Sequence, residues 1–197
     1  MDWIFSRQHP WLILLMAVVM ASIAAASASS RPKRRYPGLY WNCLISILAS
    51  SFLVTGLALT GIFQLQPWFT PQYLIPLLGM VLGNTLNGIS LALDRFLDDL
   101  QKQRDLVETH LCLGASAWEA SHDLLRSALR TGLIPSINSM AVMGVVSLPG
   151  MMTGQILAGV NPGEAVRYQM VIVFMITAAA TLGLSLIHIS EPTRLAT

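Results

Sequence analysis

Residues 41–63 read WNCLISILASSFLVTGLALTGIF, a stretch without a single Asp, Glu, Lys or Arg. An α-helix rises about 1.5 Å per residue, so about 20 apolar residues cross a hydrocarbon core of about 30 Å. This stretch is therefore predicted to be a membrane-spanning helix. Three more uncharged stretches of similar length surround it, and a fifth begins at Gln169; the predicted spans are residues 11–28, 41–63, 74–93, 134–160 and 169–183.

The composition of the whole chain agrees with several crossings. Of the 197 residues, 54% are hydrophobic and only 11% are charged, whereas a soluble domain has about 25% charged residues. The net charge of +2 argues against a nucleic-acid partner held by a broad basic surface. Cys43 and Cys112 are too few for a disulfide framework or a zinc site. The sequence predicts an all-α, multi-pass membrane protein.

The first apolar stretch has an alternative interpretation as a secretory signal peptide. Arg7 precedes it, and it ends in the small residues Ala24-Ala-Ala-Ser-Ala28. Against this interpretation stand the later spans and the basic block that follows at once, because positive charge resists translocation. That block consists of Arg31, Lys33, Arg34 and Arg35.

The distribution of basic residues predicts the orientation. With the block at 31–35 in the cytoplasm, the uncharged loop 64–73 is external and the polar stretch 94–130 returns to the cytoplasm. The cytoplasmic side then holds nine Lys and Arg residues, whereas only Arg7 and Arg167 are external. The positive-inside rule therefore favours this one topology.

The polar stretch 94–133 is expected to form a cytoplasmic elbow of two helices. Apolar residues recur at helical spacing from Asp94 to Leu113, and Gly114 can end that helix in a left-handed conformation. Ser116-Ala-Trp-Glu119 has the form of a capping box and predicts the start of a second helix, ending near Gly132. The pattern leaves open whether the elbow binds a partner or only lies on the lipid headgroups.

The C-terminal residues 184–197 are expected to be non-native. LSLIHISEPTR, from Leu184 to Arg194, resembles the in-frame translation of a sequencing-library adapter. These residues are therefore predicted to have no part in the fold or the function.

Two polar features inside the predicted spans are candidates for a translocation path. Asn84 and Asn87 share one helix face and are expected to point into the bundle, either as hydrogen-bonded packing or as a path lining. Pro149-Gly150 should kink or break the fourth span, and broken helices often mark substrate sites. Met151 and Met152 follow the break, and methionine at such positions is more often a flexible core filler than a metal ligand. The sequence does not identify metal ligands.

Several stretches resemble known transporters. Glu108-Thr-His-Leu-Cys-Leu-Gly114 resembles the start of the EAA loop of ABC-transporter membrane subunits, with Thr109 and His110 in place of two alanines. IPLLGMVLGN from Ile75 and VVSLPGMMTGQILAGVNPGEAVRYQ from Val145 resemble the FetB-like family of iron-export permeases, which is similar to plant aluminium-tolerance proteins. Members of that family begin with further membrane segments, so this chain is expected to be a fragment.

The resemblance implies a permease subunit in the inner (plasma) membrane that exports iron or another metal. It implies a partner ABC ATPase docked on the elbow, a homodimer of the permease, and no cofactor in the chain itself. The residues implied in coupling to the ATPase are Glu108, Gly114, Ser116, Trp118 and Glu119.

An intramembrane enzyme and a non-transporting scaffold are the competing hypotheses. The sequence has no G-x-S-x-G, no H-E-x-x-H and no nucleotide-binding glycine loop with its Lys and Ser or Thr. ATP hydrolysis would therefore have to come from a separate subunit, and the chain is predicted not to be an enzyme.

Overall fold

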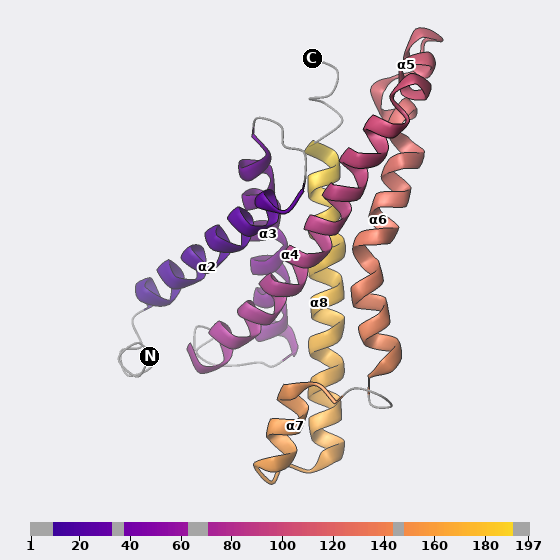
Figure 1. The fold of residues 1–197 in the computed structure, drawn as a ribbon. Helices are drawn as coiled ribbons and strands as arrows, with labels where there is room; N and C mark the ends of the chain where they lie inside the picture. Colours follow the sequence, from indigo (N-terminus) through magenta and orange to yellow (C-terminus); the bar gives the residue numbers. More distant parts are fainter. Residues whose placement is uncertain (1–9, 33–37, 63–70, 144–147, 191–197) are drawn as a thin grey trace.

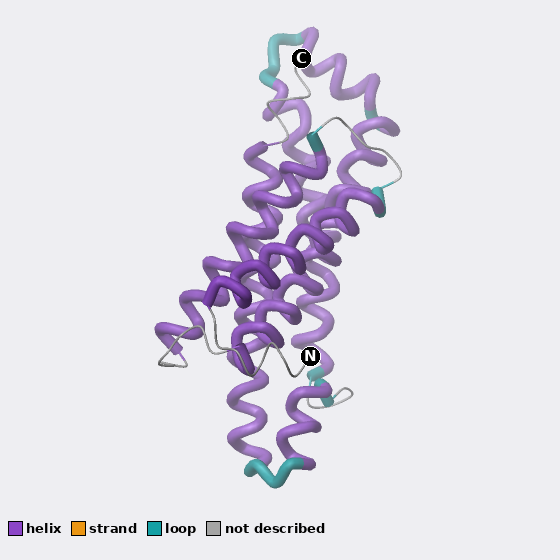
Figure 2. Tube along the Cα trace, turned by 90° about the vertical axis from the view of Figure 1, so that its left-hand side faces the viewer, coloured by secondary structure: helices purple, strands orange, loops and turns teal. Residues whose placement is uncertain are grey.

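The computed structural model describes residues 10–32, 38–62, 71–143 and 148–190. Over these ranges the regular structure consists of helices, as Figures 1 and 2 show. The elements in chain order are α2 (Pro10–Ser30), α3 (Leu39–Leu57), the π-helix η1 (Ala58–Ile62), α4 (Pro71–Lys102), α5 (Arg104–Cys112), α6 (Ala117–Val142), α7 (Gly150–Leu157) and α8 (Pro162–Ser190).

Four described helices are long and apolar enough to cross a membrane, which confirms the predicted multi-pass, all-α class. They cover Trp11–Ser30, Leu39–Ile62, Tyr73–Lys102 and Pro162–Ile187. In Figure 1, α5 lies at one end of the bundle and α7 at the other. The orienting residues Arg7, Lys33, Arg34 and Arg35 lie outside the described residues.

The third membrane helix is longer than predicted. α4 continues from the membrane stretch into the polar stretch as far as Lys102, and its 32 residues make a rod of about 48 Å. A hydrocarbon core of about 30 Å cannot contain this length, so one end of α4 projects from the bundle. The predicted helix 94–113 is thus the end of α4 plus the separate helix α5, divided at Gln103.

The predicted fourth span, residues 134–160, is two helices. α6 already begins at Ala117, passes Pro135 without ending and stops at Val142. Pro135 lies on the exposed side of α6, so its ring does not disturb the packed side that carries Gly132 and Ser136. The predicted break at Pro149 is confirmed, because Pro149 is the N-cap of the short helix α7.

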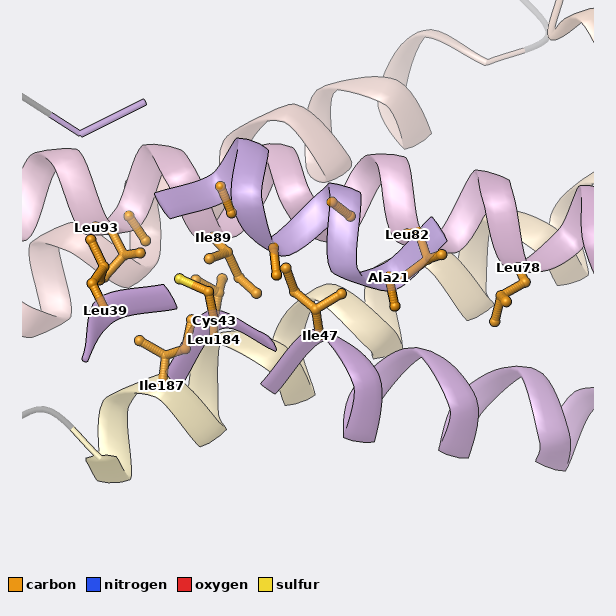
Figure 3. Close-up of a cluster of buried hydrophobic side chains, with 14 of the residues drawn as sticks. Ala21, Leu39, Cys43, Ile47, Leu78, Leu82, Ile89, Leu93, Leu184 and Ile187 are labelled. Atoms are coloured by element: carbon orange, nitrogen blue, oxygen red, sulfur yellow. The ribbon is translucent and has the colours of Figure 1, made fainter. Parts of the chain in front are cut away.

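The main core joins α2, α3, α4 and α8 (Figure 3). α2 contributes a face of small residues, which allows close packing without large side chains. The members of this cluster include Ala17, Ala21, Ala24, Ala25, Ala28, Cys43, Ile47, Leu78, Leu82, Ile89, Leu93, Leu184 and Ile187. The segment with the alternative signal-peptide interpretation therefore has a place in the bundle.

The C-terminal helix differs from the expectation that residues 184–197 take no part in the fold. α8 continues to Ser190, and Leu184 and Ile187 are buried in the main core. The apolar periodicity of α8 continues into these residues, and this is why they pack. Their non-native origin stays a prediction.

Candidate functional site

The projecting end of the molecule is a helical hairpin. The last turns of α4, the short α5 and the first half of α6 pack around Phe96, Leu124, Leu125 and Ala128. Leu97, Leu100 and Val107 cover this small core from the side. We call residues 94–130 the hairpin.

The turn of the hairpin has the predicted local geometry. Gly114 has φ +94°, a left-handed conformation that side chains rarely adopt. The Ser116 backbone N–H donates to Glu119 Oε2 at 2.8 Å, and the Glu119 backbone N–H donates to Ser116 Oγ at 3.3 Å. The capping box is therefore confirmed. The Glu119 carboxylate accepts hydrogen bonds from the Ser116 backbone N–H and, at 2.8 Å, from the Ser116 hydroxyl. These two hydrogen bonds, first of all the one from the backbone, lower the pKa of the Glu119 carboxyl.

The two other predicted coupling residues are accessible. Glu108 is exposed and accepts a hydrogen bond from Arg104 Nε at 2.7 Å. That hydrogen bond, assisted by the charge of Glu108, raises the pKa of the Arg104 guanidinium. Trp118 is also exposed and stands edge-on to His122, with ring centroids 6.4 Å apart. Both groups can reach a partner, and their coupling role stays a prediction.

A groove of about 560 Å³ runs along the hairpin. Its floor is largely apolar, and the Arg104–Glu108 pair lies at its edge. The lining residues are Leu97, Leu100, Gln101, Arg104, Val107, Glu108, Leu111, Ala117 and Ser121. At the nearby turn Leu113 is 84% exposed. Sequence reasoning did not single out Leu113 or Arg104, although an apolar residue directly before the turn glycine was a usable indication.

The predicted orientation of Asn84 and Asn87 is wrong. Both lie on the exposed side of α4, not inside the bundle. Asn84 Nδ2 donates to the Met80 carbonyl at 2.8 Å, and Asn87 Oδ1 accepts from Arg31 Nη1 at 2.8 Å. The spacing correctly places both amides on one face, but the buried faces of α4 are decided by α2, α3, α6 and α8. A part in transport stays a prediction for both.

α4 and α6 approach each other closely at two glycines. A Cβ added to Gly83, which forms a small-residue pair with Gly79, would meet no neighbouring helix within 4 Å. A Cβ on Gly132 of α6 would instead lie 2.7 Å from the Gly88 carbonyl oxygen of α4 and 2.9 Å from Ala92 Cβ. α4 and α6 therefore cross with their backbones in direct contact at Gly88 and Gly132.

The residues around the fourth-span break lie at the end of the bundle opposite the hairpin (Figure 1). Pro149 caps α7, Gly150 begins it, and Met152 is buried. Met151 is half-buried against a cluster that includes Leu77 and Ile172. Among the described residues no group of three or more His, Cys, Asp or Glu side chains is placed to hold a metal ion. A filler role for these methionines fits their apolar surroundings.

The buried polar face of α3 was not predicted from the sequence. This helix buries Asn42, Ser46, Ser50, Ser51 and Thr55. The four-residue spacing of Asn42, Ser46 and Ser50 in the first quoted stretch was the available indication, because such residues share one side of a helix. α4 adds the fully buried Thr85.

Comparison with known proteins gives several relatives. The chain is 45% identical over 179 residues to a UPF0014 membrane protein of Synechocystis, an alignment that covers 91% of this chain and 69% of the relative. It is 34% identical to Protein ALUMINUM SENSITIVE 3 of Arabidopsis thaliana, over 92% of this chain and 65% of the relative. It is 31% identical to the probable iron export permease protein FetB of Escherichia coli, over 92% of this chain and 69% of the relative.

The chain thus spans about two thirds of the length of these relatives. No solved structure matches it. The model of the uncharacterised protein family UPF0014 matches residues 1–193. This match covers nearly the whole chain, and the chain accordingly belongs to the UPF0014 family of membrane proteins.

Proposed function

We propose that this chain is the membrane-spanning permease subunit of an ABC transporter that exports iron or another metal. The observation that carries the proposal is the hairpin, which extends α4 and α6 out of the bundle and presents a groove with an exposed apolar turn. The name of the Escherichia coli relative supports the transport function and the metal substrate. ATP would be hydrolysed by a separate ATPase subunit, since the sequence has no phosphate-binding loop.

The hairpin is the proposed docking site of the ATPase. Glu108, Trp118 and Leu113 supply a charged group, an aromatic ring and an aliphatic side chain to a partner. Gly114 and the Ser116–Glu119 capping box fix the turn that presents them. We assign the hairpin to the cytoplasmic side of the inner membrane, where an ATPase has access to ATP.

The permease is proposed to work as a homodimer. Amides at membrane depth need hydrogen-bonding partners, because lipid offers none. Asn84 and Asn87 lie on an exposed face of α4, where Asn84 donates to the Met80 carbonyl and Asn87 accepts from Arg31. A side-chain amide has two donors and an acceptor, so each can also bond to its counterpart in a second copy. These two residues line a path only when a second copy covers that face. Pro149, Gly150, Met151 and Met152 remain the candidates for the external end of the path.

Docking is tested by a pair of matched leucine variants. Leu113 is 84% exposed at the hairpin turn, and Leu157 is 83% exposed at the opposite end of the molecule. We expect Leu113→Asp to lose the co-purified ATPase and its stimulated ATP turnover, whereas Leu157→Asp retains both. Cells with the Leu113→Asp protein should then accumulate more iron under iron overload than cells with Leu157→Asp.

One outcome would contradict the proposal, and another would decide which metal is exported. If no ATPase co-purifies with the unaltered protein, the scaffold and enzyme hypotheses gain support. If iron content is unchanged while another metal responds, the iron substrate is wrong and the coupling stands.

A further inference from the structure

The bundle contains an apolar cavity of about 360 Å³ between α2, α3 and α4. Its wall carries no Asp, Glu, Lys or Arg and consists of Trp11, Ile13, Leu14, Ala17, Phe52, Thr55, Gly56, Leu59, Leu74 and Leu78. The hydroxyl oxygen of Thr55 is itself covered by protein, so it offers no hydrogen bond to a molecule in the cavity. An apolar cavity of about 150 Å³ is already large enough to bind a small apolar molecule, and it stays free of water. The cavity therefore suits an apolar ligand.

The cavity lies at the end of the bundle opposite the hairpin, where α2 and α4 begin (Figure 1). Ala17 is seven residues from the start of α2 at Pro10, and Leu78 is seven residues from the start of α4 at Pro71. Seven residues of helix measure about 10 Å, whereas half of a hydrocarbon core of about 30 Å is about 15 Å. Because both helices are long enough to cross the membrane, the cavity fits within the depth of one leaflet.

The mouth of the cavity opens to the outside of the bundle. Trp11 is 80% exposed and Leu14 is 47% exposed, so the space between the helices continues to the outer surface of α2. At membrane depth this surface is in contact with lipid and not with water. Tryptophan is enriched at the membrane–water interface, where its ring lies at the level of the headgroups. A lipid that enters here has its polar end near Trp11 and its apolar end toward Leu78.

Gly56 provides space for a ligand on the α3 side of the cavity. It lies one turn after Phe52 on the same side of the helix, and a Cβ added to Gly56 would meet no other atom within 4 Å. Glycine is less favourable than alanine in a helix, and here it serves no close approach of a second helix. On the opposite wall, Leu78 also belongs to the main core (Figure 3), so the cavity directly borders that core.

We propose that this cavity binds an acyl chain of a membrane lipid. An acyl chain is uncharged, needs no hydrogen bond and extends through one leaflet, and the cavity matches each of these properties. The bound chain completes the packing of the first half of α2, whereas the second half packs directly on the core through Ala21, Ala25 and Ala28. The lipid is then a structural component of the bundle, separate from the transported substrate and from the docking of an ATPase.

A photoreactive lipid tests the proposal. The full-length protein is reconstituted in vesicles of phosphatidylcholine that carries a diazirine in the middle of one acyl chain, and the adducts are located by peptide mass spectrometry. We expect adducts at Phe52, which lines the cavity, and at Leu53, which is 54% exposed and reports the surrounding lipid. Adducts at Leu53 without adducts at Phe52 would overturn the proposal. This is the result expected if another protein segment fills the cavity.

Two glycine variants show whether the adducts at Phe52 come from the cavity. Gly56→Leu places a side chain in the cavity, so the yield at Phe52 should fall several-fold while the yield at Leu53 stays the same. Gly83→Leu is the matched control, because a Cβ at Gly83 also meets no atom within 4 Å but Gly83 is not part of the cavity wall. It should leave both yields unchanged. Equal yields at Phe52 in Gly56→Leu and in the unaltered protein would contradict the lipid site.

Thermal unfolding gives a second readout that does not depend on labelling. Removal of lipid in detergent empties the cavity, so added phosphatidylcholine should raise the melting temperature of the unaltered protein and of Gly83→Leu. In Gly56→Leu the leucine side chain already occupies the space, and the melting temperature should respond much less. An equal response of all three proteins would also overturn the proposal. These measurements need no ATPase and no metal, so failure of the lipid site and failure of the proposed function are separate results.

Discussion

α4 and α6 pack against each other twice, and the two contacts differ in kind. In the bundle their backbones touch at Gly88 and Gly132, where a single added methyl group has no room. In the hairpin, Phe96, Leu124 and Leu125 separate the same two helices. The first contact is rigid because nothing in it can yield, whereas the second depends on a small core next to water. The hairpin is therefore the part expected to open locally at the lower free-energy cost.

The largest effect is expected from emptying the hairpin core. Phe96 is 2% exposed, and Phe→Ala in a core costs about 3 kcal/mol or more. Phe96→Ala should therefore speed amide hydrogen exchange in α5 and the first half of α6, with α3 and α8 unchanged. Leu106→Ala is the control, because Leu106 is 53% exposed. Equal acceleration in α8 would show that hairpin and bundle unfold as one unit.

A smaller loss is expected at the backbone contact. Gly132→Ala forces a methyl group against the Gly88 carbonyl oxygen, and overpacking of this kind costs about 1–3 kcal/mol. In Gly83→Ala the new methyl group meets open space, and alanine is the better helix former, so this control should gain up to about 1 kcal/mol. The two variants are compared by the melting temperatures of the solubilised single chain. Equal losses in both variants would refute a special contact at Gly132.

The smallest effect concerns the cap of α6, and it depends on pH. The pKa of Glu119 is lowered in the folded state by the hydrogen bonds from Ser116. The stabilisation is therefore complete above the ordinary glutamate pKa and is lost as the pH falls through the lowered value. Hydrogen exchange in the first turn of α6 should accelerate over this acidic range in the unaltered protein.

Two variants sharpen this last prediction. Glu119→Gln should remove most of the pH dependence, and Ser116→Ala should loosen the turn at all pH values by about 1 kcal/mol. Glu164→Gln, an exposed acidic residue in the first turn of α8, serves as the control and should leave the hairpin unchanged. Identical pH profiles for Glu119→Gln and the unaltered protein would contradict the assigned cause.

The local structure of the hairpin turn was predictable from the sequence, whereas the packing of the helices against one another was not. Gly114 and the box from Ser116 to Glu119 follow from rules that involve neighbours a few residues apart, and the structure has both. Hydropathy located four of the five predicted spans, whereas the stretch 134–160 is divided between α6 and α7. It did not locate the helix ends, because it reports where lipid begins and α4 continues beyond that boundary to Lys102.

The site inside the membrane depends on contacts between distant segments. The spacing of Asn84 and Asn87 specifies a shared face but not which neighbours cover that face. The pairing of Gly88 with Gly132 joins residues 44 positions apart. The burial of Ser51 and Thr55 likewise follows from how α3 packs against α2, α4 and α8, which no single span contains.

The crossing at Gly88 and Gly132 has a mechanical consequence. Gly88 lies about 21 Å along α4 from Lys102 and about 26 Å from Pro71. For a stiff rod tilting about that crossing, the two arms are nearly equal, as in a see-saw. A sideways displacement of the hairpin would then move the far end of α4 by almost the same distance in the opposite direction.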